Sequence, residues 1–215
     1  MLHKGIFVSF EGIDRCGKST QVENLTQQLQ GEGYSVLTLR DPGGSEISEQ
    51  IRNILLSIHN MNIDPITELL LYEAARAQIV AEKIRPALQK KMIVLIDRFY
   101  DSTTAYQGYG RGLSLQAIEK ANALATGGLV PDLTIFIDIN WEESERRRGN
   151  LAADRMESED QYFFERIRNG YIQIVQENAK RVKLIDGNLP IGAIGEKIYH
   201  EILKVIRKHN PIHSN

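Results

Sequence analysis

The sequence is poor in cysteine: Cys16 is the one cysteine among 215 residues, which excludes an intrachain disulfide. We therefore expect a protein of a reducing compartment, with the cytoplasm as its location. The sequence also lacks an apolar run long enough to cross a bilayer. Residues 1–4 lead directly into the first predicted strand and leave no room for a signal peptide. No membrane partner is expected.

An excess of positive charge is missing as well. The chain has 26 Lys and Arg residues against 28 Asp and Glu residues, a formal net charge of −2. A whole-chain basic surface for a nucleic-acid polymer is therefore excluded, and any anion site has to be local. With 42% hydrophobic residues the composition is that of a globular protein. The length predicts a single domain over residues 1–215 that buries a substantial core.

Short apolar runs alternate along the chain with segments that have helical periodicity. Buried strands are predicted at residues 6–10, 35–39, 92–96, 133–139 and 182–185. This alternation indicates an α/β fold, in which a five-stranded parallel sheet is covered by helices on both faces as a three-layer α/β/α structure. Ligands of such sheets bind at the carboxyl ends of the strands, so the residues that follow each strand are the candidates for a functional site.

Helix boundaries are marked by capping residues and by proline. Asp64 followed by Pro65 predicts the start of a helix, and Asn140 with Glu143 resembles a capping box. Pro86 is expected to kink or end the long helix before it, because a proline in a helix lacks the N–H that the helical hydrogen bond needs.

The most specific motif lies directly after the first predicted strand. Residues 12–20 match the P-loop pattern, in which two glycines separated by four residues precede Lys18 and Ser19. Its glycines let the backbone amides surround phosphate oxygens, the lysine reaches the outer phosphates, and the serine hydroxyl binds magnesium. A glycine-rich turn that matches by chance is the alternative, but the strand before the motif and the helix after it favour a P-loop. The predicted ATP-binding residues are Gly12, Ile13, Asp14, Arg15, Cys16, Gly17, Lys18, Ser19 and Thr20.

Cys16 has two interpretations. Its place in the loop suggests a redox or nucleophilic role, whereas the pattern requires only a small side chain there. We favour the second interpretation.

Two more polar segments follow predicted strands, at residues 40–45 and 97–108. Asp97 ends an apolar run, the usual place for a carboxylate that holds magnesium through its water shell. Arg98 is placed to bind the phosphate of an acceptor with its planar guanidinium. The guanine-specifying Asn-Lys-x-Asp segment of a switch GTPase is missing, and the chain is too short for a large ATPase motor. The remaining prediction is a small kinase that transfers a phosphoryl group between two nucleotides.

Five motifs in the same order resemble the thymidylate kinase family. They are residues 11–20, 40–44, 72–78, 97–108 and the arginine-rich stretch 146–155. The resemblance covers most of the chain. It implies an enzyme that transfers the γ-phosphoryl group of ATP to dTMP to give dTDP and ADP, uses Mg²⁺, and forms a homodimer.

The resemblance also implies roles in acceptor binding. Tyr72 matches an aromatic that stacks on thymine, and Arg76 an arginine that donates hydrogen bonds to a base carbonyl. Asp14 and Tyr106 match groups near the deoxyribose. The Pro42 peptide resembles one that is cis in relatives. The implied dTMP-binding residues are Asp14, Tyr72, Arg76, Arg98, Ser102, Thr103, Tyr106 and Gln107.

A lid over the phosphates is expected at about residues 142–158, because water must be excluded during phosphoryl transfer. Members of the family place the catalytic arginine either in the P-loop or in the lid, and this chain has Arg15 in the first and Arg148 and Arg155 in the second. The resemblance does not choose between them. The predicted catalytic residues are Lys18, Arg15, Arg98, Asp97, Arg148 and Arg155, with Ser19 and Asp97 at the metal.

Several residues have a structural alternative. Tyr72 lies on an apolar helix and is either a core residue or a base-stacking one. Asp97 and Arg98 could form an ion pair, although neighbouring strand residues point in opposite directions. Arg146 and Arg147 follow Glu142 and Glu143 at i,i+4 spacing and are either lid residues or a solvated helix face. A different acceptor, or a nucleotide-binding regulator without transfer activity, stays open as an alternative function.

Overall fold

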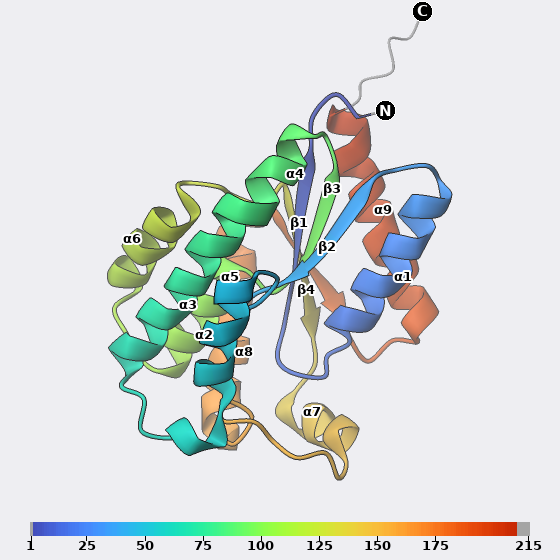
Figure 1. The fold of residues 1–215 in the computed structure, drawn as a ribbon. Helices are drawn as coiled ribbons and strands as arrows, with labels where there is room; N and C mark the ends of the chain where they lie inside the picture. The colour runs from blue at the N-terminus through green and yellow to red at the C-terminus, as the bar shows by residue number, and fades with distance from the viewer. Residues whose placement is uncertain (1, 210–215) are drawn as a thin grey trace, which may run out of the picture.

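A five-stranded parallel sheet forms the centre of the molecule (Figure 1). The computed structural model describes residues 2–209. The strand order is β2-β3-β1-β4-β5, so the strand before the P-loop is central and pairs with β3 and β4. The predicted α/β class and all five strands are confirmed. The strands are β1 (Ile6–Glu11), β2 (Val36–Arg40), β3 (Ile93–Asp97), β4 (Leu133–Asp138) and β5 (Val182–Asp186).

Helices cover both faces of this sheet. Helices α1 and α9 lie on one face, and helices α2 to α6 lie with α8 on the other (Figure 1). The α-helices are α1 (Lys18–Gly31), α2 (Glu46–Leu56), α3 (Pro65–Ile79), α4 (Arg85–Gln89), α5 (Tyr100–Thr103), α6 (Leu115–Thr126), α7 (Trp141–Arg148), α8 (Gln161–Glu177) and α9 (Ile191–His209). Shorter helical segments are the 3-10 turn Ile58–Asn60 and the π-helical segments η2 (Val80–Ile84) and η3 (Thr104–Gly110).

The core follows from the alternation of side chains along β1. Val8 belongs to a buried cluster that includes Leu25 of α1 and Ile198 of α9. Its neighbour Phe7 points to the other face and packs with Ile84 of η2. Burial on both faces explains why the central strands read as continuous apolar runs in the sequence.

The predicted helix boundaries are largely confirmed. Asp64 Oδ1 accepts hydrogen bonds from the amides of the first turn of α3, including the Ile66 N–H at 2.9 Å. Asn140 Oδ1 accepts from the Glu143 N–H at 2.9 Å, whereas the Glu143 carboxylate binds two arginines instead of returning to Asn140. Half of the capping box is therefore formed. The α-helix before Pro86 ends at Ile79 and passes through η2 into α4, so Pro86 lies in the first turn of α4 and does not end the helical path.

Within residues 2–209, no helix combines the length and the apolar character that crossing a membrane requires.

Candidate active site

The P-loop connects the central strand β1 to α1 at the carboxyl edge of the sheet. Gly12 and Gly17 adopt φ values of 140° and 104°. Residues other than glycine rarely adopt such backbone angles. A Cβ at Gly12 would lie 2.5 Å from the Ile137 carbonyl oxygen, so the position has no room for a side chain. Gly17 caps α1 and no side chain caps the first turn. The amide groups at the start of α1 are thus available to an anion.

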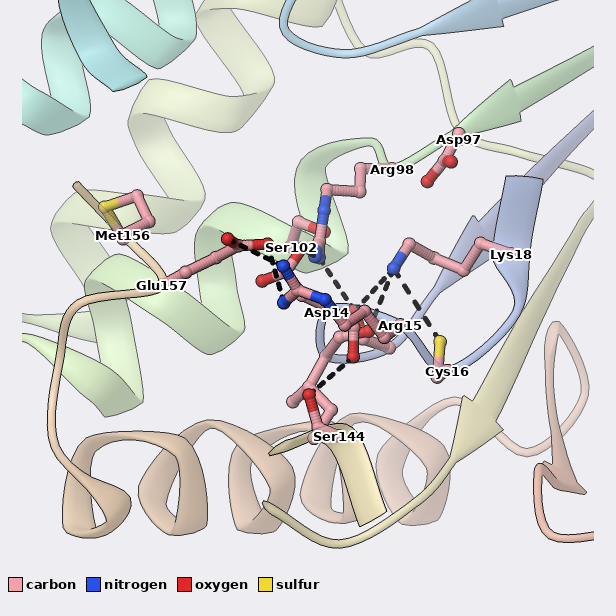
Figure 2. Close-up of polar contacts among 12 residues, drawn as sticks. Asp14, Arg15, Cys16, Lys18, Asp97, Arg98, Ser102, Ser144, Met156 and Glu157 are labelled. Atoms are coloured by element: carbon pink, nitrogen blue, oxygen red, sulfur yellow. Dashed lines mark hydrogen bonds and ion pairs between the residues drawn. The ribbon is translucent and has the colours of Figure 1, made fainter. Parts of the chain in front are cut away.

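Lys18 lies buried inside this loop (Figure 2). Its Nζ donates to the carbonyl oxygens of Gly12 at 3.2 Å and Ile13 at 3.0 Å, and lies 3.7 Å from Cys16 Sγ. The ammonium group is therefore held in the loop before any phosphate binds.

Cys16 packs beneath Lys18 and is 1% exposed. Burial raises the pKa of its thiol, although Lys18 and Arg98 act in the opposite direction. A neutral thiol is a poor nucleophile, so the environment of Cys16 favours a packing role.

Ser19 and Asp97 meet beside the loop. The Ser19 hydroxyl donates to Asp97 Oδ2 at 2.6 Å, and both residues line a cavity that also contains Lys18, Arg15 and Arg98. A hydroxyl and a single carboxylate suit a magnesium ion that keeps several waters and binds substrate phosphates. The residues that the structure describes contain no cluster of three or more acidic, histidine or cysteine side chains able to form a complete protein cage for a metal.

Arg98 lies at the junction of the P-loop and the segment after β3. Its Nη1 donates to the Gly12 carbonyl at 2.8 Å, and its Nη2 donates to Asp14 Oδ1 at 2.7 Å and to the Tyr106 hydroxyl at 3.1 Å. Arg98 itself adopts φ = 68°, a left-handed conformation that is uncommon outside glycine. Asp97 and Arg98 therefore diverge, as their strand positions predicted, because one binds Ser19 and the other binds Asp14.

Asp14 carries a negative charge in this setting. Burial acts against its charged form, but Arg98 and Lys18 outweigh burial and lower the pKa of Asp14 to about 2. The charged Asp14 forms an ion pair with Arg98, and both residues line the cavity beside the P-loop.

A second cavity adjoins the first. All eight residues that the resemblance assigned to dTMP line it, and they come from the P-loop, α3 and the segment 98–107. Tyr72 is half-buried and lines this cavity rather than joining the core clusters. The remaining lining residues are Asp41, Pro42, Arg52, Leu56, Asp154 and Met156.

Arg76 is the largest buried side chain of the acceptor cavity, with 1% of its surface exposed. Its Nε donates to Asp41 Oδ2 at 2.6 Å, and its Nη1 donates to Glu73 Oε1 at 2.6 Å and to Asn122 Oδ1 at 3.3 Å. The anion that a buried arginine needs is therefore supplied by the protein itself. The Asp41–Pro42 peptide is cis, as the resemblance implied.

Ser102, Thr103 and Gln107 differ in how their polar atoms are used. Ser102 Oγ donates to Glu11 Oε2 at 2.6 Å, and the Gln107 amide donates to Glu68 Oε1 at 2.9 Å. Thr103 Oγ1 is buried next to the Glu73 carboxylate, whose charged form it helps to stabilise. All three residues line the acceptor cavity, and each also interacts with a buried glutamate.

Comparison with known proteins bears directly on this arrangement. The family model for thymidylate kinase matches residues 10–198. A thymidylate kinase of Thermoanaerobacter sp. strain X514 is 48% identical over 206 residues, covering 96% of this chain and 99% of that protein. One from Kosmotoga olearia is 46% identical over 205 residues, covering 94% and 98%. The chain belongs to the thymidylate kinase family. It is therefore a phosphotransferase of the nucleoside monophosphate kinase class.

The fold agrees with this assignment. A crystal structure of thymidylate kinase from Ehrlichia chaffeensis superposes with a TM-score of 0.76 at 32% identity, covering 93% of this chain and 98% of that one.

The three arginines that were candidates for catalysis within this thymidylate kinase family member lie in different environments. Arg15 lines the phosphate cavity and forms a bidentate ion pair with Glu157, at 2.8 and 2.9 Å (Figure 2). Arg155 is 2% exposed and binds Glu68 Oε2 at 2.6 Å. Arg148 pairs with Glu145 on its own helix. Of the three, Arg15 is the one that faces the phosphate cavity.

Helix α7 contacts the back of the P-loop. Arg147 donates to the Arg15 carbonyl at 3.2 Å and also forms the expected i,i+4 pair with Glu143. Arg146 pairs with Glu143 as well, so the expected partner Glu142 was wrong. Glu142 instead accepts a hydrogen bond from Gln161 of α8.

Arg52 was missed by the sequence analysis. It lines both cavities and donates from Nη1 to the Pro42 carbonyl at 2.9 Å. In the sequence Arg52 follows Ile51 within an amphipathic pattern, which predicts a polar residue on a solvent-exposed helix face. Its closeness in sequence to the polar segment 40–45 was the one available signal.

Proposed function

We propose that this enzyme transfers the γ-phosphoryl group of ATP to dTMP, giving dTDP and ADP. The observation that carries the proposal is that the P-loop cavity and the acceptor cavity meet, because Asp14, Asp41, Arg52 and Arg98 line both. Phosphoryl transfer requires donor and acceptor oxygens to be aligned and the moving charge to be surrounded by positive groups. A shared wall that contains two arginines meets both requirements.

On the donor side, the amides of the P-loop and the Lys18 ammonium bind the ATP phosphates, with Thr20 at the start of α1 beside them. Ser19 and, through water, Asp97 would hold the magnesium ion. When bound, the ion neutralises phosphate charge and orients the terminal phosphoryl group. The hydrogen bond between these two side chains already brings their oxygens within 2.6 Å of each other.

On the acceptor side, Arg98 and Arg52 bind the phosphate of dTMP, and Tyr72 stacks on the base. Asp14 and Tyr106 lie beside the sugar, and the shared contact of both with Arg98 supports this placement. The position of Thr103 beside Ser102 in the lining of the acceptor cavity supports a polar contact with an edge of the base.

The lid segment of residues 142–158 closes over the reaction, and Arg15 stabilises the transferring phosphoryl group. The Arg15 side chain already lines the phosphate cavity, and its ion pair with Glu157 joins it to the lid segment. Residues 1–215 act as one kinase domain.

We also propose that the enzyme is a cytoplasmic homodimer. The single buried cysteine supports a reducing compartment. Ile66 and Leu70 of α3 are 50% and 59% exposed, and Ala74 and Ala77 continue the same face at helical spacing. Ile54 of the neighbouring α2 is also exposed. An apolar face of this kind is typical of a surface that pairs with a second copy.

A panel of acceptors tests the proposed reaction. Purified enzyme with ATP and magnesium is given dTMP, dCMP, dGMP and thymidine in separate reactions, and ADP formation is followed. We expect dTMP to have the highest kcat/KM. A purine monophosphate as the best acceptor, or binding of both nucleotides without turnover, contradicts the proposal.

A further inference from the structure

The guanidinium of Arg76 is held by three acceptors from three parts of the chain. Asp41 follows β2, Glu73 precedes Arg76 by one turn of α3, and Asn122 belongs to α6. The ring of Phe99 adds a fourth contact, 5.6 Å from the guanidinium carbon. The bonds use Nε and Nη1. Nη2 is the one nitrogen of the group that none of them uses.

The carboxylate of Glu73 adds a second negative charge beside the single positive charge of Arg76. Asp41 alone neutralises one guanidinium, yet a second carboxylate, 6% exposed, lies against the same side chain. Burial and the nearby Asp41 raise the pKa of Glu73. Its Oε2 is buried, and the Thr103 hydroxyl, like Arg76, acts in the opposite direction on the pKa of the carboxylate. A buried carboxylate of this kind costs free energy, so a contribution to overall stability does not explain it.

What Glu73 adds is orientation. A single acceptor on Nε leaves the guanidinium free to tilt about its last bonds. A second acceptor on Nη1, from a residue of the same helix, fixes its plane independently of the loop that carries Asp41. The nitrogen left over, Nη2, belongs to a side chain that lines the acceptor cavity. A fixed donor can distinguish a carbonyl oxygen from an amino group, because two donors facing each other repel.

We propose that Glu73 is a positioning residue that sets the base selectivity of the acceptor site by fixing the donor edge of Arg76. Asn122 assists by accepting a second hydrogen bond from Nη1. The selectivity is for a pyrimidine with a carbonyl, rather than an amino group, opposite Arg76. This inference rests on the proposed function and assigns α6 a part in substrate choice.

The test compares acceptors that differ in one group. Thymine and uracil present the same carbonyls, whereas cytosine carries an amino group, so kcat/KM is measured for dTMP, dUMP and dCMP. For Glu73→Ala we expect the dTMP to dCMP ratio to fall by about tenfold or more, because a loosely held donor no longer rejects the amino group. The dTMP to dUMP ratio stays within about twofold, because both bases present the same carbonyls to Arg76. Most of the change is expected in KM.

Three further variants make the result decisive. Glu73→Gln keeps an acceptor for Nη1 and is expected to retain the dTMP to dCMP ratio. Glu73→Leu fills the volume without offering an acceptor and should behave like Glu73→Ala. The dTMP to dCMP ratio is measured in whichever of these two variants folds. Glu82→Ala, an exposed change later on the same helical path, is the matched control with unchanged ratios.

Two outcomes overturn the inference: an unchanged dTMP to dCMP ratio in folded Glu73→Ala or Glu73→Leu, or a parallel loss for all three acceptors. The second outcome would show a purely structural role. A failure of the proposed function gives a different result, because the wild-type enzyme itself would then not prefer dTMP over dCMP.

Discussion

At the scale of single residues, Arg15 and Arg155 are held in opposite ways. Arg15 contacts Glu157 at the border of the phosphate cavity, whereas Arg155 is buried against Glu68. An arginine that stabilises transferring phosphate contributes about 10³-fold or more to kcat. We therefore expect Arg15→Ala to lower kcat by about that factor with little effect on the melting temperature.

Arg155→Ala is the comparison variant. It removes one partner of buried Glu68, which keeps Arg111 as its other ion pair. The expected result is a lower melting temperature and a kcat within about tenfold of wild type. A folded Arg155→Ala enzyme that loses as much kcat as Arg15→Ala would place the catalytic arginine in the lid.

Glu11 is the residue whose ionisation should matter most for stability. It is fully buried, and burial together with Asp101 raises its pKa to about 8 from an ordinary value of 4.5. Below pH 4.5 the carboxyl is protonated in both the folded and the unfolded chain. Between these two values the unfolded chain releases the proton and the folded chain keeps it, so folding becomes less favourable as pH rises towards 8.

Glu11→Gln removes this titration while keeping an oxygen that accepts from the Phe99 N–H. We expect its melting temperature to fall less than that of wild type between about pH 5 and pH 8. Glu23→Gln, on the exposed side of α1, serves as the control and should follow wild type. Identical slopes for Glu11→Gln and wild type would contradict the account of Glu11.

At the scale of elements, the segment that we propose as a lid is joined to the rest of the site by ion pairs. Glu157 binds Arg15 of the P-loop, and Glu159 binds Arg111 after η3 at 2.6 Å. These pairs hold residues 154–159 over the acceptor cavity, which Asp154 and Met156 help to line. The segment therefore connects the acceptor side of the site to the donor side.

Glu157→Ala should loosen that connection. Since an ordered lid excludes water, we expect a higher ratio of ATP hydrolysis to phosphoryl transfer, by about threefold or more. Glu165→Ala on the exposed face of α8 is the control. The ratio is measured from ADP and dTDP formed in the same reaction, and an unchanged ratio in Glu157→Ala argues against a role of this pair in lid closure.

The elements themselves were largely predictable from the sequence. Apolar runs marked the five strands to within about two residues. For β1, β3 and β4 the reason is burial on both faces, which admits little else, whereas the edge strands β2 and β5 are only partly buried. Lys18 and Ser19 were recognisable because the P-loop is one continuous segment. The partners of Arg76 and Arg155 were not, since Asn122 and Glu68 reach them only through tertiary packing. Arg52 was missed because spacing alone does not show that a polar helix position faces a cavity.

At the scale of the whole molecule, the exposed apolar face of α3 leads to a prediction about assembly. Leu70→Asp places a charge in the centre of that face, next to Ile66 and Ala74. We expect this variant to have the mass of a monomer in size-exclusion chromatography with light scattering, where wild type has the mass of a dimer. Tyr162→Asp on α8, at a side chain that is 71% exposed, is the control. A monomeric wild-type enzyme would contradict the homodimer proposal.

The central claim is that the donor and acceptor cavities meet at Arg98 and that a phosphoryl group passes between them there. The most direct test is to measure kcat/KM for dTMP and for thymidine in wild type and in Arg98→Ala, with the KM for ATP measured in parallel. We predict that wild type strongly prefers dTMP and that Arg98→Ala lowers kcat/KM for dTMP by about 100-fold or more while changing the KM for ATP little. Wild-type kinetics for dTMP in Arg98→Ala would contradict the account.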